Sequence, residues 1–178
     1  MARRKYVVGN WKMHGLAADI AEIRAIADGA RDSPNVDVAL CLPAILIERA
    51  VRQVTGIPIG AQDVHFAEKG AHTGCISAAM LHDAGASLTI VGHSERREGQ
   101  NERDDDVRSK AETALTSGLG VILCVGESLD VREAGQALAT VQAQLDAPLP
   151  HAEGAAGVAG ELAVAYEPIW AIGRGKGA

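Results

Sequence analysis

Asn10 and Lys12 lie in the segment GNWKM, residues 9–13, at the end of the first apolar stretch of the chain. Because this stretch predicts a strand, both side chains can point from its end toward one pocket, where Lys12 would offer a fixed positive charge. Taken alone the motif is weak, since strand ends commonly carry exposed polar residues.

His93 ends the next informative segment, VGHSERR, residues 91–97. A histidine at the end of a strand is well placed for proton transfer, and Ser94 is expected to cap the helical turn that follows. A lone histidine is more often structural. Its neighbours Glu95, Arg96 and Arg97 are more often surface or interface ion pairs than catalysts, so we assign them supporting roles.

Glu167 follows an apolar stretch directly, in the segment AYEPIWAIGRGKGA, residues 165–178. Gly173, Gly175 and Gly177 would allow backbone amides to approach a phosphate, but the spacing is not that of a phosphate-binding P-loop. A mobile, glycine-rich lid is the better functional interpretation, and an ordinary flexible turn is the alternative.

The composition indicates a soluble globular protein. The chain has 178 residues, of which 47% are hydrophobic and 22% charged, and this favours a single domain over residues 1–178. A net charge of -6 argues against a nucleic-acid partner, although a small anionic substrate stays possible. The N-terminus does not read as a signal peptide, and no apolar stretch approaches the ~20 residues that span a bilayer, so no membrane association is expected.

The setting of the cysteines predicts a reducing compartment, and the spacing of the cysteines and histidines predicts no metal site. Two of the 3 cysteines, Cys41 and Cys124, lie within apolar runs that read as buried strands. Core thiols of this kind suggest the cytoplasm. The 6 histidines are scattered, and no Cys-x-x-Cys or His-Glu-x-x-His spacing occurs.

The elements that must position these residues alternate between strand and helix, which is typical of an α/β protein. Six strands are predicted, over residues 5–10, 36–43, 57–62, 87–93, 120–127 and 161–168. Five helices are predicted between them, over residues 16–31, 44–54, 77–84, 102–117 and 129–147. The strands are apolar almost throughout, as burial on both faces of a parallel sheet requires.

Both an open doubly wound sheet and a closed barrel fit this alternation, and polar residues at the strand ends favour the barrel. In an open sheet only the strands at the switch point need such residues. Here they follow five of the six strands, as Asn10, Gln62, His93, Glu127 and Glu167.

Five segments together resemble motifs of the triosephosphate isomerase family, in family order and across the whole chain. They are GNWKM, GAQDVHFAEKGAHTG, VGHSERR, GVILCVGE and AYEPIWAIG. The resemblance implies a (β/α)8 TIM barrel, here one incomplete domain over residues 1–178. It would comprise about six strand-helix units and end inside the active-site lid loop.

The resemblance also implies a reaction, the interconversion of dihydroxyacetone phosphate and D-glyceraldehyde 3-phosphate through an enediol, in glycolysis and gluconeogenesis, without a cofactor. Glu167 would be the base and His93 the electrophile that polarises the carbonyl. Lys12 would stabilise negative charge, Asn10 would position the substrate, and Gly173 would supply a lid amide to the phosphate.

Further roles follow from the same resemblance. Ser94 and Glu95 would support His93, and Trp170 would lie in the lid hinge. Thr73, in GAHTG, and Arg96 would contact the partner of a homodimer. The sequence departs from the usual family residues at five positions, which are His14, His72, Cys75, Arg174 and Gly177. Cys75 replaces an acid that usually pairs with a partner arginine, so we expect Arg96 to lack that ion pair.

Two other readings of the chain remain open. One is an inactive or weakly active fragment that acts at most as a binding or dimerisation module, and the other is a different phosphosugar-handling barrel enzyme. The latter has no reason to keep GNWKM and VGHSERR together. Because a closed barrel of this type needs eight strands, we expect residues 1–178 alone to be a poor or inactive isomerase.

Overall fold

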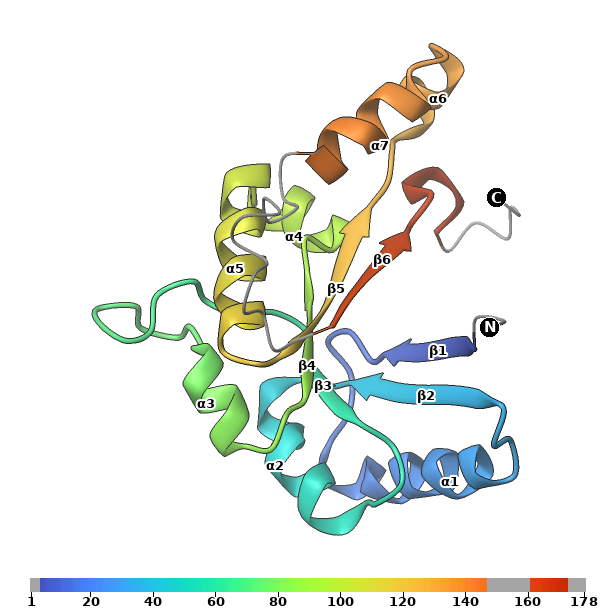
Figure 1. Ribbon diagram of the computed structural model, residues 1–178, viewed down its shortest axis with the longest axis vertical. Helices are drawn as coiled ribbons and strands as arrows, with labels where there is room; N and C mark the ends of the chain where they lie inside the picture. The colour runs from blue at the N-terminus through green and yellow to red at the C-terminus, as the bar shows by residue number, and fades with distance from the viewer. Residues whose placement is uncertain (1–3, 147–160, 173–178) are drawn as a thin grey trace. The chain divides into compact units, whose positions relative to one another are not determined.

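Strands and helices alternate along the chain in the computed structural model, which describes residues 4–146 and 161–172 (Figure 1). The strands are β1 (Lys5–Asn10), β2 (Val36–Cys41), β3 (Ile59–Ala61), β4 (Leu88–Val91), β5 (Gly120–Val125) and β6 (Leu162–Tyr166). The helices are α1 (Ile20–Arg31), α2 (Ala44–Gln53), α3 (Ala78–Asp83), α4 (Ser94–Gly99), α5 (Asp104–Thr116), α6 (Leu129–Glu133) and α7 (Ala137–Asp146). Single 3-10 turns cover Ala17–Asp19 and Ile169–Ala171. The strands form one six-stranded sheet in chain order.

The chain divides into two compact units, and the first comprises Met1–Thr89. In it β1 pairs with β2 in parallel from Lys5↔Val36 to Asn10↔Cys41, and β2, β3 and β4 continue the parallel pairing. Gly60 allows β3 and β4 to approach, because a Cβ there would lie 2.6 Å from the Leu88 side chain. Figure 1 shows α1 alongside β2, with the buried stripe Ile20, Ile23 and Ala27.

The second unit, Ile90–Ala178, positions Glu167 at the end of β6. Here β5 pairs with β6 in parallel from Val121↔Leu162 to Val125↔Tyr166. Helix α5 lies along β5 (Figure 1) and buries an apolar stripe at helical spacing, formed by Val107, Ala111, Ala114 and Leu115. Acidic residues in its first turn suit the positive end of the helix dipole.

All six predicted strands are confirmed, the first with the predicted bounds and the other five with shorter ones, but two helix predictions need correction. The helix predicted over 129–147 is two helices, because Gly135 adopts a left-handed φ of 71° and ends α6. Ser94 does not cap α4 but is its first residue. The N-cap is His93, whose side chain accepts from the Glu95 backbone N–H, leaving Ser94 buried.

Burial on both faces holds for β3, β4 and most of β5, but not for β1 and β6. Every residue of β3 and β4 is buried, whereas β6 carries exposed Leu162, Val164 and Tyr166, and β1 carries exposed Tyr6 and Val7. Each of these two strands has one neighbour in the sheet order, and no strand of residues 4–146 and 161–172 pairs with its other side.

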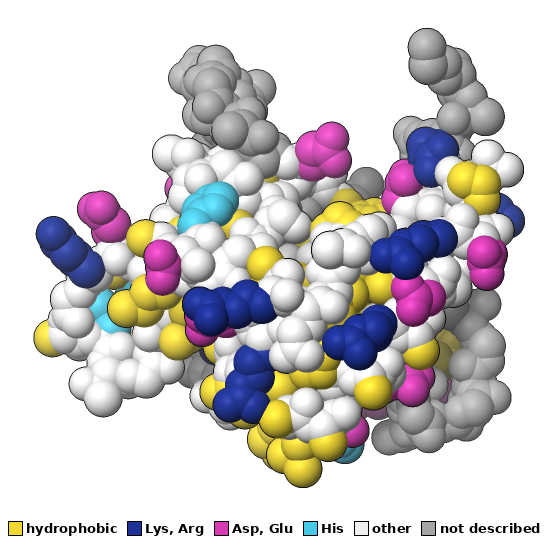
Figure 2. Space-filling view, turned by 90° about the horizontal axis from the view of Figure 1, so that it is seen from below, with side chains coloured by type: hydrophobic (Ala, Val, Ile, Leu, Met, Phe, Trp, Pro, Cys, Tyr) yellow, Lys and Arg dark blue, Asp and Glu magenta, His cyan; other side chains and the backbone are white. Residues whose placement is uncertain are grey.

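The surface mixes charges of both signs. Figure 2 shows Lys and Arg side chains interleaved with Asp and Glu side chains on the face that it presents. Exposed pairs such as Arg31–Asp28 and Arg52–Glu48 contribute little stability each, because water screens them. Within the described residues, no helix combines the length and apolar character needed to cross a membrane.

Candidate active site

Asn10 and Gln62, two polar residues at strand ends of the first unit, are hydrogen-bonded to each other. Asn10 Oδ1, at the end of β1, accepts from the backbone N–H of Lys12 at 2.9 Å and from Gln62 Nε2 at 3.1 Å. Gln62 Nε2 also donates to the carbonyl of Lys12 at 2.8 Å. Gln62 follows β3. The sequence predicts its place at the end of a strand but not its contacts with Asn10 and Lys12.

Lys12 has a strained backbone. Its φ of 52° lies in the left-handed region, which non-glycine residues adopt at a cost. The Lys12 N–H donates to Asn10 and the Lys12 carbonyl accepts from Gln62, so hydrogen bonds hold this conformation on both sides of the residue. Such strain is kept where the surrounding structure fixes the backbone, and it often marks a functional position.

His93 and Glu167 meet in the second unit. His93 Nε2 lies 3.1 Å from Glu167 Oε1, and the backbone N–H of Ser94 lies 3.4 Å from Glu167 Oε2. The His93 side chain is buried, whereas that of Glu167 is 23% exposed. A carboxylate that is accessible yet aimed by two donors suits a general base.

The hydrogen bonds of His93 define its tautomer. Nδ1 accepts from the Glu95 backbone N–H at 3.2 Å, so it carries a lone pair and no proton. Nε2 therefore carries the hydrogen in neutral imidazole and can donate it to Glu167 Oε1. The exposed carboxylate of Glu95 lies farther off, 3.8 Å from Nδ1, so Glu95 acts on His93 chiefly through its backbone.

Glu127 is the centre of a cluster that sequence reasoning missed. This buried carboxylate follows β5, and its Oε1 accepts from Tyr166 Oη at 3.0 Å, Trp170 Nε1 at 3.0 Å and Arg132 Nη1 at 3.1 Å. The Arg132 guanidinium also lies 4.6 Å from the centre of the Trp170 ring. The cluster fixes the segment after Glu167. The sequence alone predicts only that Glu127 is a polar residue at the end of a strand.

The cluster lowers the pKa of Glu127 below its ordinary value. Burial raises this pKa, but the hydrogen bonds from Trp170, Tyr166 and Arg132 together lower it more. Because the folded-state pKa is depressed, the ionised carboxylate stabilises the fold above the ordinary carboxyl range. That contribution is lost as the pH falls through the depressed value.

We expect Glu127→Gln to lower the free energy of unfolding at pH 7 by about 1–3 kcal/mol, since an amide is a weaker acceptor and buries new donors. Denaturant titrations at pH 7 and below the carboxyl range measure the effect, and the gap to the parent should narrow at acid pH. Glu133→Gln, at an exposed position on α6, is the control. An equal loss of unfolding free energy at both pH values would contradict a depressed pKa of Glu127.

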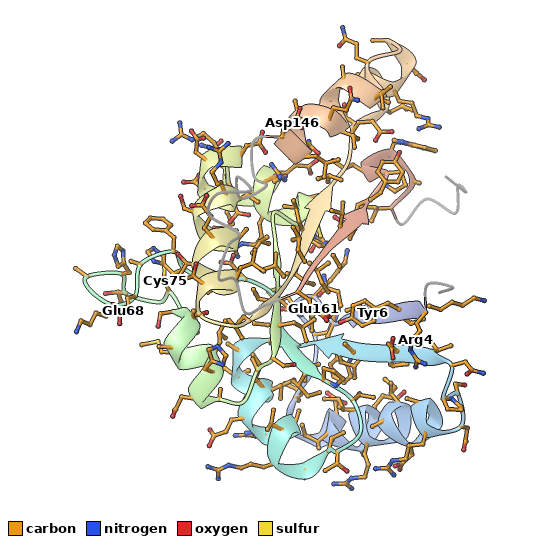
Figure 3. The ribbon with its side chains drawn as sticks, viewed as in Figure 1. Arg4, Tyr6, Glu68, Cys75, Asp146 and Glu161 are labelled. Carbon is orange, nitrogen blue, oxygen red and sulfur yellow. The ribbon has the colours of Figure 1, made fainter. Side chains whose placement is uncertain are left out.

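The remaining predicted residues lie elsewhere. Thr73, His72 and Cys75 are exposed in the loop between β3 and α3, and Figure 3 shows Glu68 and Cys75 on this loop. Arg96 Nε lies 3.4 Å from buried Glu102, which also pairs with Lys110. Three predicted lid residues, Gly173, Arg174 and Gly177, lie outside the described residues.

The cysteines divide as expected. Cys41 and Cys124 are buried and Cys75 is exposed, all three as free thiols. Burial raises the pKa of the Cys41 thiol to about 12, which keeps it protonated and unreactive at neutral pH. These two buried cysteines therefore act as small core residues.

Parallel strands carry polar side chains at their ends, and a histidine lies beside an accessible carboxylate, an arrangement in an α/β fold that suits proton transfer. The triosephosphate isomerase family model matches residues 5–178. The chain belongs to the triosephosphate isomerase family. Its fold is the (β/α)8 barrel of that family, of which this chain carries six strands.

Relatives support this assignment. The chain is 51% identical to triosephosphate isomerase from Ruegeria sp. (strain TM1040) over 175 residues, 97% of this chain and 68% of that protein. It is 47% identical to triosephosphate isomerase from Hyphomonas neptunium over 176 residues, 97% of this chain and 69% of that protein. The crystal structure of triosephosphate isomerase from Bartonella henselae is 40% identical, with a TM-score of 0.87 over 94% of this chain and 69% of that one.

Proposed function

We propose that this chain catalyses the triosephosphate isomerase reaction, the interconversion of dihydroxyacetone phosphate and D-glyceraldehyde 3-phosphate. The observation that carries the proposal is the pair formed by a neutral His93 and Glu167, with Nε2 and Oε1 3.1 Å apart, in a member of this family. This reaction needs one group that takes a proton from carbon and one that donates to the neighbouring oxygen.

In the proposed mechanism Glu167 removes a proton from the carbon beside the substrate carbonyl. The electrons of that C–H bond form the enediol, and negative charge develops on the carbonyl oxygen. His93 Nε2–H, released from Glu167 by the substrate, donates to this oxygen and stabilises the transition state more than the substrate. Glu167 then returns the proton to the adjacent carbon. The old carbonyl oxygen gains a proton and the neighbouring hydroxyl, which becomes the new carbonyl, loses one, with His93 Nε2 moving the proton between the two oxygens, so the isomerisation is complete without a cofactor.

Lys12 and Asn10 are proposed to act on the same substrate. The ammonium of Lys12 would attract the phosphate and the developing oxyanion, while Asn10 would fix both the Lys12 backbone and the substrate. Their mutual hydrogen bond, 2.9 Å from Lys12 N to Asn10 Oδ1, supports a shared function. Gly173 is proposed as a phosphate ligand from the family motif alone.

We also propose a cytoplasmic homodimer. The exposed loop that carries Thr73 would provide one contact with the partner, and Arg96, engaged with Glu102 in its own chain, would provide another. Buried thiols at Cys41 and Cys124 agree with a reducing compartment. Size-exclusion chromatography with light scattering tests the dimer, and a monomer at micromolar concentration would contradict it.

A coupled assay with glyceraldehyde 3-phosphate tests the function. We expect residues 1–178 alone to isomerise this substrate slowly, because the apolar side chains exposed on β1 and β6 leave those strands poorly supported. Turnover that disappears in Glu167→Gln would support the isomerase. Its complete absence from a cooperatively folded chain would support a binding or dimerisation module, and family-like kcat/KM would contradict the expected weakness.

Lys12→Met should raise KM and lower kcat together, since the lost ammonium serves both binding and the transition state. Because the interaction is ionic, the parent should lose affinity with added salt more steeply than the variant. Steady-state kinetics at two ionic strengths measure both effects. Lys5→Met, at an exposed position of β1, is the matched control. If Lys12→Met matches the parent in KM and salt dependence, the positive charge comes from another residue.

A further inference from the structure

A small cavity lies against Glu167 within the second unit. Its volume is about 10 Å³, and its lining includes Ser94, Arg97, Cys124, Gly126 and Glu167. A cavity of this size holds about one water molecule where polar groups in its lining bind that water. Two residues whose side chains carry opposite charges, Arg97 and Glu167, therefore line a space large enough for one water.

Arg97 has an unused donor at this place. Its Nε donates to the Gly92 carbonyl at 2.7 Å, and its Nη1 donates to Asp104 Oδ1 at 2.6 Å. Nη2 is buried and has no hydrogen-bond partner among the described residues. The absence of a side chain at Gly92, whose φ is 68°, leaves room for Nη2. A Cβ at this position would lie 3.0 Å from that nitrogen.

A buried guanidinium nitrogen without an acceptor carries a large desolvation cost. One water in the cavity would remove this cost by accepting from Nη2, and it could donate to an acceptor on the other side. We infer that Arg97 is a positioning residue for Glu167, which it holds through a single water in this cavity.

The other contacts of Glu167 leave room for such a role. The Ser94 N–H bond to Oε2 is long, at 3.4 Å, and the His93 bond to Oε1 must be released when substrate binds. A cation held in place by Asp104 and Gly92 would keep the carboxylate ionised and oriented at that moment. His93 lies against the Glu167 carboxylate, and Arg97 and Cys124 line the same cavity as Glu167.

The inference rests on the proposed role of Glu167 as the base, but its tests do not need turnover. The first is a crystal structure of the chain at a resolution that shows ordered waters. We expect one water within hydrogen-bond distance of both Arg97 Nη2 and Glu167. A dry cavity, or a water that contacts Arg97 but not Glu167, would overturn the inference.

The second test follows the titration of the Glu167 carboxylate by carbon NMR in variants of Arg97. Arg97→Met should move the titration midpoint upward by about one pH unit, since a nearby cation favours the ionised form. Arg97→Lys should recover part of this shift by restoring the charge. Arg103→Met, which removes an exposed arginine of the same unit, should leave the midpoint unchanged.

The outcomes separate this inference from the proposed function. An unchanged midpoint in a folded Arg97→Met variant would overturn the link to Glu167 even if the parent is an active isomerase. A parent with the bridging water and the shifted midpoint but no turnover would instead contradict the proposed function. If Arg97→Met does not fold, the water position in the parent and the midpoint in Arg97→Lys decide the question.

Discussion

Glu167→Gln is expected to lower kcat by about 10²–10⁴-fold, the range that general-base catalysis typically contributes, while KM should change little. The amide has the size and shape of the carboxylate, so it can still accept from His93 at Oε1, as Glu167 does at 3.1 Å. It cannot take a proton from carbon at neutral pH. Steady-state kinetics measure the loss, and deuterium exchange from solvent into the substrate reports proton abstraction directly.

Glu161→Gln is the matched control for this prediction. Glu161 is exposed, directly precedes β6, and is labelled in Figure 3, so its substitution removes a charge without touching His93. We expect its kcat and exchange rate to equal those of the parent. Near-normal turnover in Glu167→Gln would remove Glu167 from the role of base.

Gly126→Ala is expected to displace Glu167 and to lower kcat/KM by about 10²-fold, the cost of an error of about 1 Å in a catalytic group. A Cβ at Gly126 would overlap the backbone carbonyl oxygen of Glu167, closer than any contact allows. This neighbour is backbone, so it cannot turn aside as a side chain would. The end of β6 must therefore move.

The same substitution should cost stability. Overpacking typically costs about 1–3 kcal/mol, and the Gly126 N–H bond to Gln144 Oε1, now 2.7 Å, is strained by the same shift. Thermal unfolding measures this effect, and kinetics measure the first. Gly99→Ala is the control, because nothing lies within 4 Å of a Cβ there. Parent-like turnover and stability in Gly126→Ala would show that β6 moves without cost.

The sequence motifs predicted which polar residues lie at the ends of the strands. The hydrogen-bond partners of those residues became clear only from the structure. The sequence placed His93 and Glu167 after two different strands, and the resemblance supplied their roles. Nothing in the sequence said that Nδ1 of His93 accepts from Glu95, because this depends on where α4 begins. The expected cap at Ser94 was wrong by one residue for the same reason.

Local signals in the sequence determined the element order and the fold class. Apolar runs of strand length, helical spacing and glycine turns act over a few residues, so they can be read without a fold. Even there, Gly135 ended a helix that its neighbours would have continued, because a left-handed residue breaks the hydrogen-bond ladder.

The tertiary structure alone decided the supporting contacts of the site. Glu127 meets Trp170 across 43 positions of sequence, and Arg97 shares a cavity with Glu167 although neither residue type nor spacing connects them. Lys12 adopts its left-handed backbone because Asn10 and Gln62, which follows β3, hold it there. Such contacts form only when strands pair and pack, since burial gives a polar group few available partners and makes an unpaired one costly.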